Sequence, residues 1–442
     1  MHEVALWETA LEEELPVDQR QTFDEKTLLP CHYFDYMYGT STGGLIATML
    51  GRLRMNIPDC LEYYKKVGND LFGRKRSPIP LATKYHHKPL EKAVREIVRK
   101  HCPVHPDGEC KGDDWHPWYL DDAGDEPPYV EPFSEDTSER ICQSICLTAT
   151  HNNQISEAYL LRTYNHRYSI KTPEYIIRYN EGADKLAIWQ VTRATSAAPF
   201  FFKALVADVA NERRTFKDGG IRENNPSVAA WSEFTSLYGD DKNPALLLSI
   251  GTGRPNMEQD GFATAWPGPF GHLGAVRKAA ETFAVFRNML VKYTQGEERH
   301  QSMLHQAKGD WTWYKRLNVD TGMENMKLDN WEKSVESSIV TDADGKERTK
   351  KVVVPGGKSL KRMEDATQLY LSRELSPELK EYAAPKVILA QVAEKLVRAR
   401  RARERTAEKD PLRWESFMGR RLRRRIDSNE EISKSSVAGE RK

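Results

Sequence analysis

The stretch Gly39-Thr40-Ser41-Thr42-Gly43-Gly44 decides the fold, because it joins two segments with different hydrophobic patterns. The preceding residues, 31–38, are rich in aromatic side chains and contain no Gly or Pro, as expected of a buried strand. A helical pattern begins at Leu45. A serine on a strand-to-helix turn lifts its hydroxyl away from the backbone, and flanking glycines let the two elements approach closely. The stretch therefore predicts a nucleophile elbow with Ser41 at its tip.

The start of the helix behind Ser41 offers a place for a developing negative charge. The first N–H groups of a helix have no partners within the helix, and they lie at the positive end of its dipole. We therefore expect the backbone N–H of Thr42 to donate to an oxyanion formed next to Ser41.

Further motifs follow in a fixed order down the chain: Arg193-Ala194-Thr195-Ser196-Ala197-Ala198-Pro199, Phe216-Lys217-Asp218-Gly219-Gly220, Asn224-Asn225-Pro226 and residues 246–253. With the elbow, they make residues 31–253 resemble the patatin-like phospholipases, most closely the fungal ones, with weaker similarity as far as Trp331. The resemblance implies a Ser-Asp dyad in which Ser41 is the nucleophile and Asp218 the general base, without a histidine.

The requirements of such a dyad agree with the residues around Asp218. An aspartate of ordinary pKa is a weak base, so it has to be held in place and partly desolvated. A carboxylate at the end of a strand followed by Gly219 and Gly220 can sit in a tight turn close to another element. A plain turn is the alternative interpretation, since Asp-Gly is a common turn dipeptide. The complete set of motifs favours the catalytic role.

One part of the family pattern has no counterpart in this sequence. Patatin-like enzymes form their oxyanion hole with a glycine-rich loop, D-G-G-G-x-R-G, whereas the first glycine here is Gly39. The segment 4–15 is similar to the helix that follows that loop. We therefore expect a serine acyl hydrolase for phospholipids or other lipid esters, working through an acyl-enzyme but with impaired oxyanion stabilisation. A catalytically inactive patatin-like protein with a lipid-binding or regulatory role is the alternative.

A conventional Ser-His-Asp hydrolase is a further alternative. It requires a histidine after the acid in chain order, and the candidates are His272, His300 and His305. It would give the 193–199 and 216–220 motifs no role, so we favour the dyad.

Other residues near the motifs are expected to support the site. Arg193 is expected to anchor its turn through carbonyl groups or a carboxylate, and Asn224 and Asn225 to hold the turn after Asp218. Asp35 is expected to be structural.

Composition narrows the class of protein. The chain has 442 residues, 39% of them hydrophobic, and a net charge of +1, so it can bury one large core and has no general attraction to nucleic acid. Its six cysteines follow no regular framework, and no apolar run reaches the ~18 residues of a transmembrane helix. We expect an intracellular, cytoplasmic protein, with peripheral contact to membranes as one open alternative. The acidic N-terminal residues do not resemble a signal peptide.

No cofactor or metal is expected. Histidines and cysteines gather between residues 101 and 116, but their spacing matches no standard zinc module: His101, Cys102, His105, Cys110 and His116.

The order of elements predicts an α/β fold. Strand-like runs at 141–150, 175–179 and 245–250 alternate with helical patterns such as 59–67 and 89–100, which favours a three-layer α/β/α domain with a mainly parallel sheet. We assign residues 1–335 to this domain, with a surface insertion at about 102–139. A polar loop, 336–361, and a helical, basic region, 362–442, follow.

The basic C-terminal region allows several interpretations. A helix over 385–405 ends in an arginine-rich turn, and a second cluster, 420–425, follows Trp414 and Phe417. Contact with anionic lipid headgroups, a solvated tail and a nuclear-import or nucleic-acid signal all fit this pattern.

Overall fold

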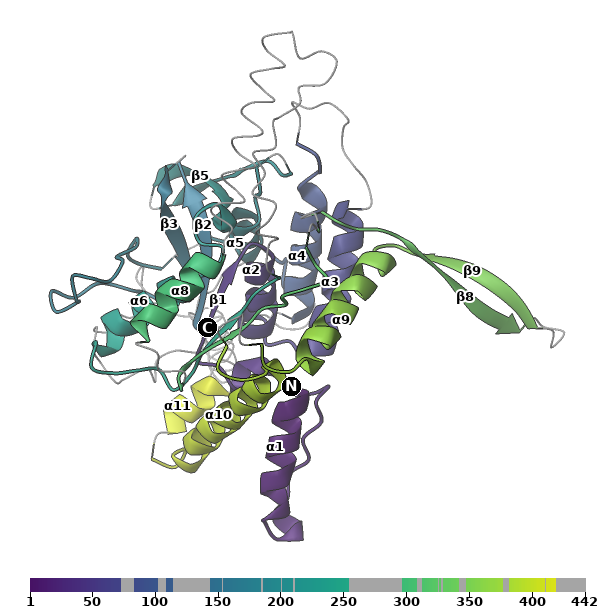
Figure 1. The fold of residues 1–442 in the computed structure, drawn as a ribbon. Helices are drawn as coiled ribbons and strands as arrows, with labels where there is room; N and C mark the ends of the chain where they lie inside the picture. The colour runs from purple at the N-terminus through teal and green to yellow at the C-terminus, as the bar shows by residue number, and fades with distance from the viewer. Residues whose placement is uncertain are drawn as a thin grey trace, which may run out of the picture.

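The structure is a computed structural model, shown in Figure 1. It describes residues 1–72, 83–101, 109–113, 144–152, 154–183, 186–199, 201–209, 211–253, 296–307, 312–324, 326, 329–341, 347–376, 381–409 and 411–418. The predicted insertion therefore lies outside the described residues except at 109–113, and so does the arginine cluster at 420–425.

The helices follow the amphipathic patterns of the sequence. In α4, the buried positions recur every three or four residues and form one apolar stripe: Leu90, Ala93, Val94, Ile97 and Val98. The helices are α1 (His2–Glu13), α2 (Thr42–Ala47), α3 (Ile57–Phe72), α4 (Lys88–His101), α5 (Ile188–Thr195), α6 (Ser227–Tyr238), α8 (Gly296–Gln306), α9 (Gly357–Ser372), α10 (Pro385–Arg405) and α11 (Pro411–Phe417). Of the helices described, none combines the length and apolarity needed to cross a bilayer.

The strands form one larger sheet and two smaller ones within the described residues. The larger sheet contains β1 (Tyr36–Thr40), β2 (Ser144–His151), β3 (Gln154–Arg162), β4 (Leu205–Val209) and β5 (Glu212–Asp218). The strands β6 (Leu247–Ile250) and β7 (Tyr314–Leu317) pair in parallel, and β8 (Ser334–Thr341) and β9 (Glu347–Val354) form an antiparallel hairpin. The sheet is mixed rather than mainly parallel: β1 runs parallel to β2, whereas β3 and β5 run antiparallel to it and β4 antiparallel to β5.

The register of β1 and β5 along β2 determines where the candidate site forms. β3 pairs with one edge of β2 over Cys146–His151, so β1 and β5 must share the other edge. Thr40 lies opposite Thr148, and Asp218 lies opposite the next residue, Ala149. Because β1 and β5 run in opposite directions, their carboxyl ends meet at this point.

Helices cover both faces of the larger sheet, which confirms the predicted three-layer α/β/α architecture. Side chains alternate along β2: Ile145 and Leu147 pack with α2, α4 and α5, whereas Cys146 packs with Ala229 of α6. Figure 1 shows α2, α3 and α4 on one side of the strands and α6 with α8 on the other.

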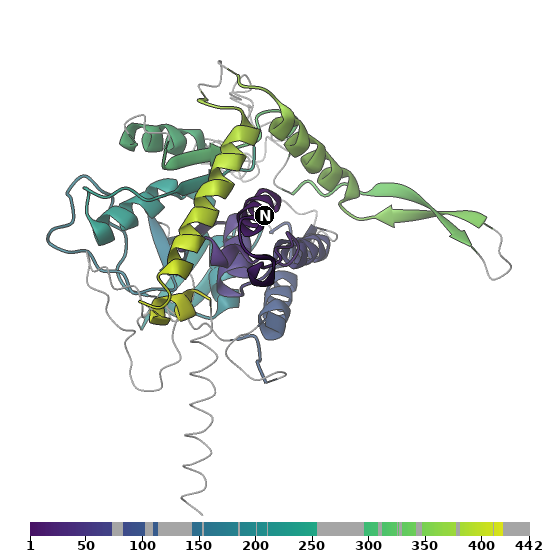
Figure 2. The same ribbon diagram turned by 90° about the horizontal axis from the view of Figure 1, so that it is seen from below.

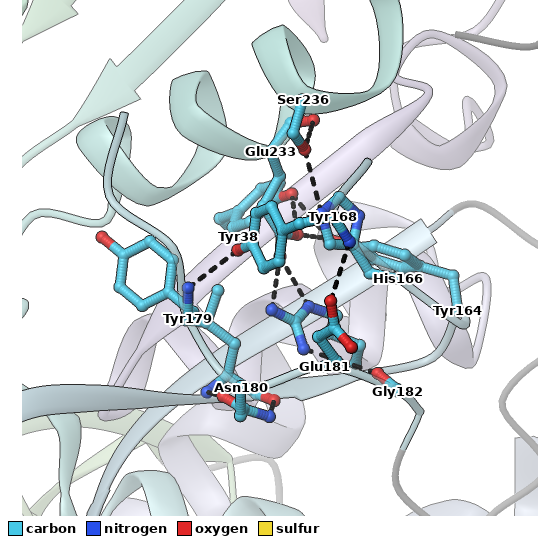
Figure 3. Close-up of polar contacts among 12 residues, drawn as sticks. Tyr38, Tyr164, His166, Tyr168, Tyr179, Asn180, Glu181, Gly182, Glu233 and Ser236 are labelled. Atoms are coloured by element: carbon cyan, nitrogen blue, oxygen red, sulfur yellow. Dashed lines mark hydrogen bonds and ion pairs between the residues drawn. The ribbon is translucent and has the colours of Figure 1, made fainter. Parts of the chain in front are cut away.

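A network of polar side chains is buried between the sheet and α6 (Figure 3). Arg162 and Glu233 form an ion pair with no exposed side-chain surface, in which Arg162 Nε lies 2.6 Å from Glu233 Oε1. Tyr38 donates to Glu233 Oε2 at 2.8 Å, and Tyr164 donates to the same oxygen. Burial would raise the pKa of Glu233, but the charges of Arg162 and His166 and the hydrogen bonds from Arg162 and Tyr164 together outweigh it and lower the pKa to about 2. Glu233 is therefore ionised in the core and fully paired there.

The termini of the described chain pack against each other. Val4 of α1 and Ile388, Val392 and Val397 of α10 share a core cluster that also contacts β6 and β7. Figure 2 shows α10 lying across the molecule beside α1. The helix predicted over 385–405 is confirmed, and so is the helical character of the C-terminal region where the structure describes it, as far as residue 418.

Some predicted elements are wrong. Residues 336–361, expected to form a polar loop, contain most of the β8–β9 hairpin and the start of α9; the hairpin extends away from the body in Figures 1 and 2. Residues 175–179 form a turn and an extended segment without sheet pairing, with Tyr175 57% exposed. The strand expected from residue 31 begins only at Tyr36, after a 3₁₀ turn at Pro30–His32.

Candidate active site

Ser41 lies on a sharp turn between a strand and a helix. It follows the last residue of β1 and precedes the first residue of α2, and its backbone has φ 56° and ψ −122°. A non-glycine residue rarely adopts a positive φ, and such strain persists only where the surroundings enforce it. Strained residues of this kind cluster at functional sites.

Two of the three glycines around Ser41 are required by close packing. A Cβ on Gly39 would lie 2.4 Å from the carbonyl oxygen of Gly43, and one on Gly44 would lie 2.8 Å from Thr195 Cγ2. A Cβ on Gly43 would meet nothing within 4 Å. The expectation that the flanking glycines permit close approach therefore holds for Gly39 and Gly44 but not for Gly43.

This difference gives a matched pair of variants. Gly39→Ala should distort the turn and destabilise the protein, since the new methyl group would overlap backbone atoms that cannot move independently. Gly43→Ala should be tolerated and should even stabilise α2 by roughly 0.5–1 kcal/mol, the usual gain of alanine over glycine in a helix. Urea denaturation of both variants measures the contrast, and equal destabilisation by the two would contradict it.

Asp218 ends β5 and begins a tight turn. Its Oδ1 accepts a hydrogen bond from the N–H of Gly220 at 2.7 Å, and its own N–H donates to the carbonyl of Ala197 at 3.1 Å. Gly219 passes so close to β2 that a Cβ would lie 2.3 Å from the carbonyl oxygen of Thr148. Asp218 is thus at a strand end followed by two glycines in a tight turn, as predicted, and it is only 6% exposed.

Ser41 and Asp218 are in direct contact. Ser41 Oγ donates a hydrogen bond to Asp218 Oδ2 at 2.7 Å, although the two residues are 177 positions apart in the chain. Burial raises the pKa of Asp218 to about 6, while the hydrogen bonds from Ser41 and Gly220 oppose that rise. A carboxylate with this pKa is ionised at neutral pH and is a better proton acceptor than an exposed aspartate.

A set of hydrogen bonds fixes the residue before Ser41. Thr40 Oγ1 donates to the carbonyl of Glu223 at 2.6 Å and lies 2.8 Å from Thr148 Oγ1. The carboxylate of Glu223 is buried and bound by Arg299 at 2.6 Å, and burial raises its pKa to about 7 although Arg299 acts against this. No pattern in the sequence predicts that Thr40, Thr148 and Glu223 belong to this region.

Thr195 is another residue near Ser41 whose role is not predicted from the sequence. Its Oγ1 accepts a hydrogen bond from the backbone N–H of Ser41 at 2.9 Å. The feature of the sequence that points to Thr195 is its position inside the Arg193–Pro199 motif.

Thr42 is the first residue of α2 and is exposed. Its backbone N–H lies in the first helical turn, where N–H groups have no partner within the helix. The position therefore suits a donor to an oxyanion beside Ser41.

Arg193 and Asp35 make structural contacts as expected, whereas the hydrogen bonds of Asn225 reach Ser227 and Gly296 and not the turn after Asp218. Arg193 is buried, with Nε 3.2 Å from Glu91 Oε1 and another nitrogen donating to the carbonyl of Lys203 at 2.5 Å. Asn225 Oδ1 accepts from the N–H of Ser227 at 3.2 Å, at the start of α6. Asp35 lies away from Ser41 in an ion pair with Arg403 at 3.2 Å.

The histidine candidates are not brought to Ser41 where the structure describes them. His300 is buried on α8, with Nδ1 3.0 Å from the hydroxyl of Tyr314, and His305 lies on the same helix. His272 lies outside the described residues. Of the residues considered for zinc, the structure describes His101, which stacks edge-on against Tyr63, and Cys110, whose sulfur accepts from Gly112 at 3.3 Å.

Arginines at the end of α10 bind acidic side chains of the same chain. Arg401 Nε donates to Glu8 Oε2 at 2.6 Å, and Arg400 donates to Glu8 Oε1 at 3.1 Å, with Glu8 fully buried. Arg403 binds Asp35. These three residues are therefore not part of a free solvated tail, and contact of the basic region with lipid headgroups stays a prediction.

Comparison with known proteins identifies a family. The patatin-like phospholipase family matches residues 23–231. The chain is 28% identical over 233 residues to the calcium-independent phospholipase A2-gamma of Rattus norvegicus and of Homo sapiens, an alignment that covers 52% of this chain and 25% of each relative. It is 23% identical over 246 residues to a protein of Arabidopsis thaliana named "Probable inactive patatin-like protein 9", covering 51% of each.

The matched region contains Ser41, Asp218 and the whole 193–199 motif. The chain spans about a quarter of the length of the phospholipase A2-gamma relatives. On this evidence, the chain carries a patatin-like phospholipase domain over residues 23–231.

Proposed function

We propose that this protein hydrolyses carboxylic esters of lipids with a Ser41–Asp218 dyad. The observation that carries the proposal is the 2.7 Å hydrogen bond from the hydroxyl of Ser41, on a strained strand-to-helix turn, to the buried carboxylate of Asp218. The phospholipase names of the relatives support a lipid ester as substrate.

The proposed reaction has two halves. Asp218 Oδ2 takes the hydroxyl proton as Ser41 Oγ attacks the ester carbonyl carbon, and the N–H of Thr42 stabilises the resulting oxyanion. The intermediate collapses, Asp218 returns the proton to the departing alcohol or lysolipid, and Ser41 carries the acyl group. Water then attacks the acyl-enzyme with Asp218 as general base, which releases the fatty acid and restores Ser41.

Comparison with the variant Ser41→Ala tests this proposal. The wild-type protein should release fatty acid from phosphatidylcholine in mixed micelles and p-nitrophenol from p-nitrophenyl butyrate, and the variant should not. Wild-type rates equal to those of Ser41→Ala would contradict the proposal and would favour the alternative, a patatin-like protein without turnover.

The decrease of kcat/KM at acidic pH should reflect the protonation of Asp218. The general base has to be ionised, and burial raises the pKa of Asp218 to about 6, so kcat/KM should fall tenfold per pH unit below about pH 6 and level off above it. Glu223, with a pKa raised to about 7, titrates nearby, and Glu223→Gln provides the control. If the acid limb of the kcat/KM profile keeps its midpoint near pH 6 in Glu223→Gln, the titrating group is Asp218. If the limb disappears in this variant, the titrating group is Glu223.

A further inference from the structure

The backbone N–H of Ser41 needs an acceptor from outside its own secondary structure. The pairing of β1 with β2 ends at Thr40, one residue earlier, and α2 begins one residue later. A buried backbone N–H without an acceptor is costly, so native structures nearly always provide one. Here the hydroxyl of Thr195 provides it, with Oγ1 2.9 Å from the nitrogen of Ser41.

Thr195 differs in this respect from another threonine of the same helix. Thr192 donates its hydroxyl proton to the carbonyls of Ile188 and Trp189, each at 3.0 Å, which is the common behaviour of threonine within a helix. Thr195, the last residue of α5, instead accepts a hydrogen bond from the backbone N–H of Ser41, 154 positions away. Both threonines are buried, at 1% and 0% exposure, so they form a matched pair.

The same short segment also contacts the other half of the dyad. The carbonyl of Ala197 accepts the hydrogen bond from the N–H of Asp218 at 3.1 Å. The methyl group of Thr195 also packs against the start of α2, because a Cβ on Gly44 would lie 2.8 Å from it. Residues 195–197 therefore accept hydrogen bonds from the backbone N–H groups of both Ser41 and Asp218.

We infer that Thr195 is a positioning residue that holds Ser41 in its strained conformation with the hydroxyl aimed at Asp218. The inference rests on the proposed function. A strained backbone persists only when its surroundings enforce it, and the Thr195 hydrogen bond acts on the strained residue itself. Without this bond the turn can relax, and Ser41 Oγ moves away from the carboxylate.

The test compares Thr195→Val, Thr195→Ala and Thr195→Ser with Thr192→Val in the full chain. Valine and alanine cannot accept a hydrogen bond from Ser41, whereas serine can. The readouts are the rate of labelling by a fluorophosphonate, kcat and KM for p-nitrophenyl butyrate, and the midpoint of urea denaturation. Thr195→Val and Thr195→Ala should lower the labelling rate and kcat by ~10–10²-fold with little change in KM, as expected for a misplaced reacting group.

Thr195→Ser should restore rates close to those of the wild-type protein, and Thr192→Val should lose stability without a matching loss of rate. If Thr195→Val and Thr195→Ala are labelled as fast as the wild-type protein, or if Thr195→Ser is as slow as they are, Thr195 does not position Ser41. Should the folded wild-type protein resist labelling, the proposed function fails and this inference fails with it. Normal labelling of wild type and of Thr195→Ala would overturn only the inference.

Discussion

Asp218→Asn is expected to lower ester hydrolysis by ~10²–10⁴-fold, the usual contribution of a positioned general base. The amide has nearly the same shape as the carboxylate and can still accept the hydrogen bond from the N–H of Gly220. It cannot take the proton of Ser41 Oγ, so the nucleophile would stay in place without activation. Steady-state hydrolysis of p-nitrophenyl butyrate measures the loss.

The same substitution should stabilise the fold at neutral pH. Burial raises the pKa of Asp218 from 3.8 to about 6, so between these values the folded state binds more protons than the unfolded state and stability falls as pH rises. Above pH 6 the buried charge costs roughly 3 kcal/mol, since one pKa unit corresponds to about 1.36 kcal/mol. Urea denaturation should show Asp218→Asn to be more stable than wild type at pH 7, and this advantage should vanish below pH 4.

His272→Ala is the control for the choice of base. It should change the rate by less than about tenfold, below the contribution of one general base. A loss as large as that of Asp218→Asn would show that a histidine takes part and that the dyad is incorrect.

The second large effect concerns the buried ion pair between Arg162 and Glu233. Removing either partner, as in Glu233→Ala or Arg162→Ala, should destabilise the protein by about 3–5 kcal/mol, because it leaves an uncompensated buried charge. In Glu233→Ala, Tyr38, which lies on β1 three residues before Ser41, would also lose its contact with Glu233. Urea denaturation at neutral pH measures both variants.

The double variant Arg162→Met/Glu233→Leu separates this explanation from a simple loss of packing. It removes both charges and should recover part of the lost stability, since replacing a buried pair by apolar groups is often neutral. The hydroxyls of Tyr38 and Tyr164 can still bond to each other, as they do at 2.6 Å in the native protein. A double variant that is less stable than both single variants would contradict the explanation.

The candidate site could be predicted from the sequence because its motifs are local. The elbow around Ser41 and the strand end at Asp218 each lie within a few consecutive residues, and the structure places each as expected at its own position. Their contact depends on the register of β1 and β5 along β2, which no local pattern specifies. The predicted pairing of Ser41 with Asp218 came from the family resemblance.

Strand direction could not be predicted for a related reason. Strand-like runs that alternate with helical patterns are typical of a parallel sheet covered on both faces. The antiparallel neighbours of β2, which are β3 and β5, also lie in a sheet covered by helices, so the pattern does not distinguish the two arrangements. The resulting sheet is mixed.

Some contacts and elements outside the larger sheet could not be predicted from the sequence, because the residues that form them are polar. The β8–β9 hairpin has no consistent apolar face, so its composition indicated a loop, although Asp344-Gly345 is a turn dipeptide between two runs rich in Val, Ser and Thr. The ion pairs of the α10 arginines could not be predicted from the sequence, because Glu8, which binds Arg400, lies 392 residues earlier in the chain.

Mass spectrometry of the protein after reaction with a fluorophosphonate identifies the nucleophile directly. We expect one covalent adduct on the tryptic peptide that contains Ser41, no adduct in Ser41→Ala, and slower formation in Asp218→Asn, because the hydroxyl that reacts is the one bonded to Asp218 Oδ2. An adduct on another residue, or one that persists in Ser41→Ala, would contradict the account, as would a folded wild-type protein that forms none.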